Sequence, residues 1–182
     1  MKQRVQRATA VAFSATMVVA GVVATTPIGV AVAAVNDPDA AVFISEIHYD
    51  NLGTDTGETV EVFGPAGTDL TGWRVVRYNG ANGLAYATPP EATTLPAAIP
   101  DLGGGYGVAV VTYPSNGVQN GAPDGLALVD GAGVALEFIS YEGSFVAVDG
   151  PAAGVQSVDI GVAQGGAGAV GNSLQRAGRA TC

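Results

Sequence analysis

Cysteine, histidine and basic residues are scarce in this chain. The only cysteine is Cys182, at the last position, which excludes an internal disulfide framework and a metal site with several cysteine ligands. The only histidine is His48, so any Ser-His-Asp triad must use it, and no Gly-x-Ser-x-Gly elbow accompanies it. We expect His48 to be a sheet-face residue bonded to a polar neighbour, and we expect no catalytic site in this chain.

Basic residues are outnumbered by acidic ones, seven to sixteen. This balance disfavours direct nucleic-acid binding, because that affinity depends on Lys and Arg meeting phosphates. Charged residues of both signs make up only 13%, which is too few for a long solvated helix or a coiled coil. Hydrophobic residues make up 48%, which argues against disorder of the highly charged kind. With 27 glycines and 10 prolines, the composition is typical of short segments joined by tight turns.

The first 34 residues differ from the rest of the chain. Three basic residues stand near the start, and an uncharged stretch rich in Ala and Val follows from Ala8 to Ala34. The stretch ends in Ala-Val-Ala-Ala, which fits the small-x-small pattern cut by signal peptidase, so we expect cleavage near Ala33 or Ala34. The stretch is also long enough for an uncleaved membrane anchor, but Pro27 and the small residues after it favour cleavage.

Cleavage at this point changes the charge of what remains. Residues 35–182 hold all sixteen acidic residues, four arginines and no lysine, a net charge of −12. We therefore expect a secreted, extracellular bacterial protein with no membrane span after signal cleavage, in an oxidising compartment that is often rich in Ca²⁺. Residues 35–41 are predicted to be a short polar linker. Residues 42–182 are predicted to form one domain around a single core.

Short apolar runs separated by Gly, Pro, Asn and Asp follow the linker. Each is about four to eight residues long and rich in Val, Ile, Tyr or Phe, which is strand composition. The runs are Val42–Tyr49, Thr59–Phe63, Trp73–Tyr78, Tyr106–Tyr113, Gly125–Val129, Val134–Tyr141 and Ser173–Arg176. In the second run, alternation places Val60 and Val62 on the core face and Glu61 on the other face. The pattern predicts an all-β sandwich or barrel.

Three connections and the only tryptophan carry predictions of their own. Asp130–Gly133 should close a hairpin, because Gly tolerates a positive φ. Pro89–Pro100 contains four prolines and predicts a surface connection rather than a core strand. Gly161–Gly171 is rich in Gly and Ala, which predicts a flexible segment. Trp73 is expected to fill the core rather than to present a ligand platform.

A long, ordered series of motifs resembles a known domain. It begins with Phe-Ile-Ser-Glu-Ile-His-Tyr-Asp-Asn at residues 43–51 and continues with Gly-Pro-Ala-Gly-Thr-Asp-Leu-Thr-Gly-Trp at residues 64–73. Gln-Asn-Gly-Ala-Pro-Asp-Gly follows at residues 119–125, and Phe-Ile-Ser-Tyr-Glu-Gly-Ser-Phe at residues 138–145. From about residue 42 to residue 176 the chain resembles the bacterial lamin-tail domain. The version it resembles lies near the N-terminus of secreted nucleases of the endonuclease/exonuclease/phosphatase family.

The resemblance implies an immunoglobulin-like β-sandwich, in agreement with the strand pattern. Two departures from the family pattern matter. Domains of the family usually run on through another aromatic-containing strand after Ser-Leu-Gln, here residues 173–175, so we expect a C-terminal truncation that leaves a sheet edge unpaired or core surface exposed. No nuclease domain follows, so the nuclease activity of longer relatives is not carried over.

Acidic residues gather after the first predicted strand. Asp50, Asp55 and Glu58 lie in or beside one loop, and Ca²⁺ takes six to eight oxygen ligands of the kind that loops supply. These three carboxylates are therefore the candidate metal ligands, with Ca²⁺ as the candidate ion. The alternative gives them Asx-turn and capping roles, together with ion pairs to Arg74 or Arg77.

These observations lead to three hypotheses about function. The first is a non-catalytic, secreted lamin-tail-like domain for binding, adhesion or targeting, which holds an extracellular protein, a glycan or a cell-surface ligand. The second is an N-terminal accessory fragment of a secreted endonuclease/exonuclease/phosphatase-family nuclease whose catalytic domain is absent here. The third is a structural surface protein that self-associates through an unpaired sheet edge.

Overall fold

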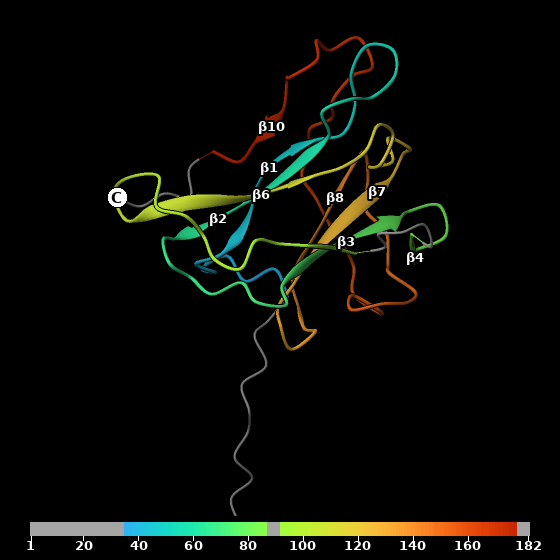
Figure 1. Cartoon of the computed structure of the whole chain (residues 1–182). Helices are drawn as coiled ribbons and strands as arrows, with labels where there is room; N and C mark the ends of the chain where they lie inside the picture. Colours follow the sequence, from blue (N-terminus) through green and yellow to red (C-terminus); the bar gives the residue numbers. More distant parts are fainter. Residues whose placement is uncertain (1–34, 87–91, 178–182) are drawn as a thin grey trace, which may run out of the picture. The chain divides into compact units, whose positions relative to one another are not determined.

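The computed structural model describes residues 35–86 and 92–177, and these residues form an all-β fold of two sheets in a sandwich-like arrangement (Figure 1). The described residues contain no helix that could cross a membrane. The predicted signal peptide, residues 1–34, lies outside the described residues, as does Cys182. The prediction of an all-β sandwich is confirmed at this level.

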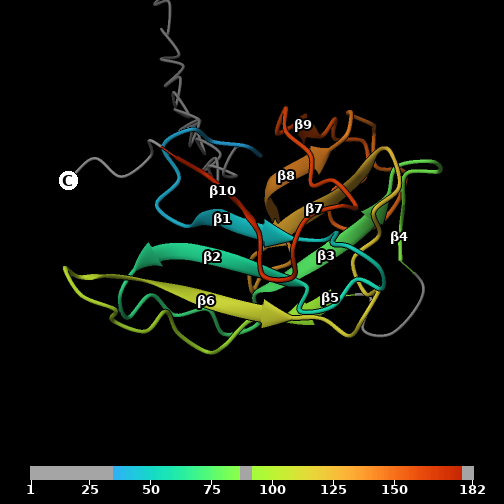
Figure 2. The ribbon, with the colours of Figure 1, turned by 90° about the horizontal axis from the view of Figure 1, so that it is seen from above.

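The first sheet has the strand order β10-β1-β2-β6, which can be followed in Figure 2. Its strands are β1 (Phe43–His48), β2 (Thr59–Pro65), β6 (Tyr106–Thr112) and β10 (Leu174–Gln175). All neighbours in this sheet are antiparallel. In β2 the side chains of Val60 and Val62 are buried and that of Glu61 is half-buried on the opposite face, as the alternation predicted.

The second sheet has the order β4-β3-β7-β8-β9, and β5 also pairs with β3. Its strands are β3 (Arg74–Asn79), β4 (Leu84–Ala85), β5 (Ala92–Thr94), β7 (Asp124–Val129), β8 (Ala135–Tyr141) and β9 (Val158–Asp159). The hairpin between β7 and β8 closes at Asp130–Gly133 as predicted, with the Gly133 N–H donating to the Asp130 carbonyl and Gly133 at φ 88°. β9 is the exception to antiparallel pairing, because it runs parallel to β8.

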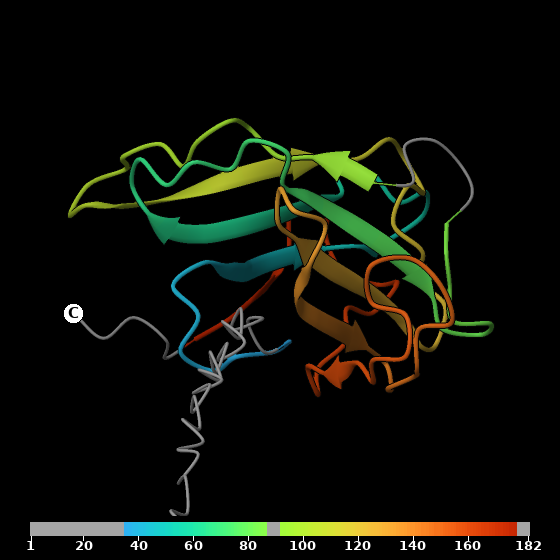
Figure 3. The same cartoon turned by 90° about the horizontal axis from the view of Figure 1, so that it is seen from below.

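The core lies between the two sheets, and the second sheet is also covered on its outer face (Figure 3). Every side chain of β7 is buried, as expected for a strand packed on both sides. On the outer face, Phe138 packs edge-on against Tyr78 and Phe145, with ring centroids 5.1 and 5.4 Å apart. Trp73 is half-buried against the inner core, so the prediction that it fills the core is confirmed only in part.

Two segments predicted to be loose connections contribute to the packing. Within Pro89–Pro100, residues 92–94 form β5 against β3, and Leu95 and Ile99 are buried in the core between the sheets. The prediction of a surface connection was therefore wrong for this part, because pairing with β3 outweighs the neighbouring prolines. Within the predicted linker, residues 35–41, Asn36 donates its N–H to the Leu136 carbonyl at 2.9 Å and so lies against β8.

Candidate functional site

The strand ends bring several polar side chains together at one end of the sandwich. β1 and β8 end there, and β2 and β7 begin there, because these neighbouring strands are antiparallel. The predicted ligands Asp50, Asp55 and Glu58 all lie in the connection from β1 to β2. The loop that follows β6, residues 113–123, packs on the same connection and supplies most of their partners.

Glu58 is fully buried, and both of its carboxylate oxygens accept backbone hydrogen bonds. The N–H groups of Gly117 and Val118 donate to it at 2.7 and 3.0 Å. Burial raises the pKa of the Glu58 carboxyl, while the two amide donors oppose the rise. Its geometry is that of a side chain that fixes the 113–123 loop against β2.

Asp55 and Asp50 lie next to each other. Asp55 accepts hydrogen bonds from the Asn51 N–H and the Asn120 side-chain amide, both at 3.0 Å. Burial and then the nearby Asp55 carboxylate raise the pKa of Asp50. Asp55 is therefore buried and bonded, whereas Asp50 is half-buried and lines a polar hollow beside residues 163–173.

This arrangement bears on the predicted Ca²⁺ site. Asp50 and Asp55 provide a pair of carboxylates, but both Glu58 oxygens are already engaged by amides. Among residues 35–86 and 92–177, no three His, Cys, Asp or Glu side chains form a group that could hold a metal ion. The Asn51–Asp55 contact matches the alternative interpretation of these carboxylates as loop-forming groups. Calcium binding by Asp50, Asp55 and Glu58 remains a prediction.

His48 is buried, and both of its ring nitrogens have a partner. Nδ1 lies 3.0 Å from Nε2 of Gln164, and Nε2 lies 3.1 Å from the carbonyl oxygen of Thr56. These partners place the proton on Nε2, because a carbonyl only accepts and the Gln164 amide nitrogen only donates. The expectation of a sheet residue bonded to polar neighbours is confirmed.

Gln164 is a residue that sequence reasoning missed. Its Oε1 accepts the Tyr49 N–H at 2.5 Å, its own N–H donates to the Tyr49 hydroxyl at 2.7 Å, and its Nε2 donates to the Asn172 carbonyl at 2.8 Å. The segment Gly161–Gly171, predicted to be flexible from its composition, is therefore held to the end of β1. A single glutamine in a Gly-rich stretch was the only available signal.

Asp124 and Arg77 are two further buried charged residues at this end. Asp124 Oδ1 accepts the Gly80 N–H at 3.1 Å, and the backbone N–H of Gly121 also favours the charged form of this carboxyl. Burial raises the pKa of Asp124 to about 6. The Arg77 guanidinium lies over the rings of Tyr86 and Tyr113, 5.1 and 4.8 Å from their centroids. These cation–π contacts join Arg77 of β3 to Tyr86 and to Tyr113, which begins the 113–123 loop.

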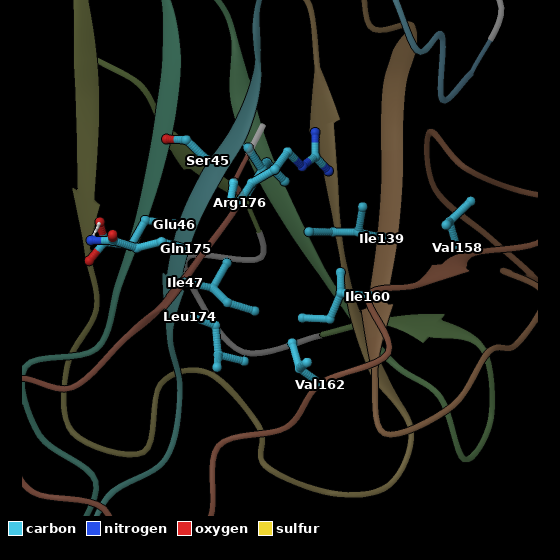
Figure 4. Close-up of a pocket in the computed structure, with 12 residues that line it drawn as sticks. Ser45, Glu46, Ile47, Ile139, Val158, Ile160, Val162, Leu174, Gln175 and Arg176 are labelled. Atoms are coloured by element: carbon cyan, nitrogen blue, oxygen red, sulfur yellow. Dashed lines mark hydrogen bonds between the residues drawn. The ribbon is translucent and has the colours of Figure 1, made fainter. Parts of the chain in front are cut away.

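A groove of about 370 Å³ opens between the two sheets on the side where β1 faces β8. Figure 4 shows side chains from the strands on both sides pointing toward one another across it. The apolar lining consists mainly of Ile44, Ile47, Ile139, Ile160, Val162 and Leu174. Val162 is 57% exposed, so part of this apolar surface faces solvent.

The polar hollow that contains Asp50 adjoins the groove at β10. Leu174 and Gln175 of β10 line both, and Gln164 and Asn172 line the polar part. A ligand in the groove would therefore meet an apolar surface between the sheets and polar groups at the loop end. This combination is typical of a binding site in which a few polar groups set orientation.

Comparisons of the chain with protein-family models, with curated proteins and with solved structures found no match. The resemblance to the lamin-tail domain therefore remains a prediction.

Proposed function

We propose that this chain is a non-catalytic, secreted binding domain of the lamin-tail type, with an immunoglobulin-like sandwich. Its role is adhesion or targeting: it holds an extracellular protein, a glycan or a cell-surface ligand. The Ig-like type is supported by the way consecutive strands change sheets, since β2 lies in the first sheet, β3 in the second and β6 in the first again. Secretion is supported by the leader at residues 1–34.

The groove between the sheets is the observation that carries this proposal. A sandwich normally closes its core with side chains, but here Val158 and Val162 of the groove lining are 50% and 57% exposed. Exposed apolar surface rimmed by polar residues marks a place where a partner binds. The rim is polar, with Glu46, Gln175 and Arg176 beside the apolar floor.

The hydrogen bonds of the buried polar residues at the loop end of the sandwich support a structural role for these residues. His48 has both ring nitrogens engaged, and Glu58 accepts two backbone amides. Groups held in this way order the loops that surround the groove's polar end. They do not form the nucleophile–base pair that a hydrolase requires.

A matched pair of variants tests the proposal. Val162 lines the groove and is 57% exposed, while Val170 is 64% exposed and is not part of the lining. The full chain and its Val162→Arg and Val170→Arg variants are tested on arrays of purified extracellular proteins and glycans. We expect specific binding by the wild type and by Val170→Arg, and its loss in Val162→Arg.

Two results would count against the proposal. Folded wild-type protein, verified by circular dichroism, that binds nothing on either array would remove the support for a binding domain. Binding that survives in Val162→Arg as well as in Val170→Arg would show that the groove is not the site.

A further inference from the structure

Two very short edge strands border the groove. β9 ends the second sheet and β10 ends the first, and each is two residues long. An edge strand presents backbone N–H and C=O groups that another extended chain can pair with. Ile160 continues the pairing of β9 along β8, since its N–H donates to the Ser140 carbonyl at 2.8 Å. Of the two edges, β10 is the one that lies beside the Glu46 and Glu61 carboxylates.

The register of β10 fixes how an added strand would face. Leu174 pairs with Ile47 and Gln175 pairs with Glu46, so one side chain points to the groove and the next points to the outer face (Figure 4). The Arg176 N–H donates to the Ser45 carbonyl at 2.8 Å. Because antiparallel hydrogen bonds alternate along a strand, Gln175 turns its own N–H and C=O away from β1. The backbone N–H and C=O of Gln175 are therefore positioned to pair with an added strand.

The charges beside β10 indicate the sign of the charge that a partner segment should carry. Glu46 accepts a hydrogen bond from the Gln175 amide and sits opposite Glu61 across the sheet, an arrangement of like charges that is unfavourable. The nearby cation, Arg176, is already paired with Glu137 at 2.6 Å. A positive side chain arriving on the outer face beside Gln175 would offset the negative charge at Glu46 and Glu61.

The net charge disfavours a second copy of the chain as the occupant. Residues 35–182 carry a net charge of −12, so two copies repel each other, whereas a basic segment is attracted. An extended partner segment also fits the shape of the site, which is a groove running beside a strand edge.

Resting on the proposed function, we infer that the groove accepts an extended, basic segment of a partner protein that adds as a strand beside β10. Alternate residues of the segment are apolar and enter the groove against Leu174 and Ile47. The residues between them are Lys or Arg and lie on the outer face near Glu46. Backbone pairing supplies affinity, and the alternation of apolar and basic side chains supplies selectivity.

Short fluorescein-labelled peptides test this inference by fluorescence anisotropy with the full chain. In the probe, valine and lysine alternate. One control peptide has the same composition with all valines before all lysines, and another replaces each lysine by glutamate. We expect the alternating Val-Lys peptide to bind at least about tenfold more tightly than either control, and its affinity to fall as NaCl is raised.

Protein variants locate the bound peptide. Val162→Arg should weaken binding by about tenfold or more, while Val170→Arg should leave it unchanged. Glu46→Gln keeps an oxygen that can accept from Gln175 but removes the charge, so it should weaken binding of the lysine peptide about twofold to fivefold. Asp101→Asn, at an exposed site, is its charge-matched control.

Several outcomes would overturn the inference. Equal binding of the alternating and block peptides would exclude strand addition, and tighter binding of the glutamate peptide would exclude the basic partner. A wild-type dimer in analytical ultracentrifugation that becomes monomeric in Val162→Arg would assign the groove to a second copy. Peptide binding by a chain lacking residues 178–182, but not by the full chain, would assign it to the chain's own C-terminal residues. Array binding that needs Val162 without any peptide binding would leave the proposed function standing and refute only the strand-like partner.

Discussion

Asp124 offers a sharp test of the electrostatics at the loop end of the sandwich. Its side chain is 2% exposed, one carboxylate oxygen accepts the Gly80 N–H, and the backbone N–H groups of Gly80 and Gly121 only partly offset the cost of burying the charge. The Asp124→Asn substitution keeps an oxygen for the Gly80 amide and removes the buried negative charge. We predict that this variant is more stable than the wild type at neutral pH and not at low pH.

The sign and size follow from the pKa of Asp124, which burial raises from 3.8 to about 6. Because the folded state binds this proton more tightly, the stability from Asp124 is fully present below pH 3.8 and is lost as pH rises to about 6. At 1.36 kcal/mol per pKa unit, the loss is about 3 kcal/mol. Asp124→Asn should avoid this loss, so its advantage over the wild type should grow by about 2–3 kcal/mol between pH 4 and pH 7.

Urea unfolding at a series of pH values, followed by Trp73 fluorescence, measures this difference. The comparison is made with the exposed variant Asp101→Asn, whose stability relative to the wild type should change little over the same range. Unchanged denaturant slopes would show that only stability differs. A constant penalty for Asp124→Asn at every pH would refute the reasoning, because it would mean that the buried charge is not a cost to the fold.

Three further predictions address the loops. Gln164→Ala should destabilise the protein by about 2–3 kcal/mol, since it leaves buried groups at His48 and the neighbouring backbone without partners. Hydrogen exchange should then be faster at residues 161–172, and unchanged exchange would contradict the anchoring role of Gln164. Gly80→Ala should lower the free energy of unfolding in urea by about 3 kcal/mol, because a Cβ there overlaps the backbone of Pro123. Gly165→Ala is the control and should be close to neutral, because a Cβ there meets open space. Equal effects of the two substitutions would refute the close approach at Gly80. At the predicted Ca²⁺ site, Ca²⁺ at a hundredfold excess over Kd should stabilise the fold by about 2.7 kcal/mol, and Asp50→Asn should remove this gain. Identical thermal melts in Ca²⁺ and in EDTA would assign the carboxylates of Asp50, Asp55 and Glu58 to loop structure alone.

Local rules of the chain were sufficient for much of the sheet architecture. The alternation of Val60, Glu61 and Val62 correctly predicted which side chains of β2 face the core, because successive strand side chains point to opposite faces. The hairpin at Asp130–Gly133 was also predictable, since Gly133 adopts a positive φ that other residues resist. Both features depend on a few neighbouring residues.

The candidate site depends on contacts that no local pattern contains. The acidic residues after β1 suggested Asp50, Asp55 and Glu58 as a group. Sequence spacing alone could not show that both Glu58 oxygens accept hydrogen bonds from backbone N–H groups 59 and 60 residues further along the chain. The groove was likewise not predictable in detail, because its walls come from β1, β8, β9 and β10, which meet only after the sheets pack.

Composition and alternation alone determined that this chain is acidic and folds into short strands with a core between their faces. Only the tertiary structure decided that residues 92–94 become a strand, that Gln164 holds a Gly-rich segment in place, and that an apolar groove stays open beside β10. The physical reason is the range of the interactions. Strand composition and tight turns follow from torsions within a few residues, whereas edge pairing and buried hydrogen bonds depend on partners tens of residues away, which the fold alone brings together.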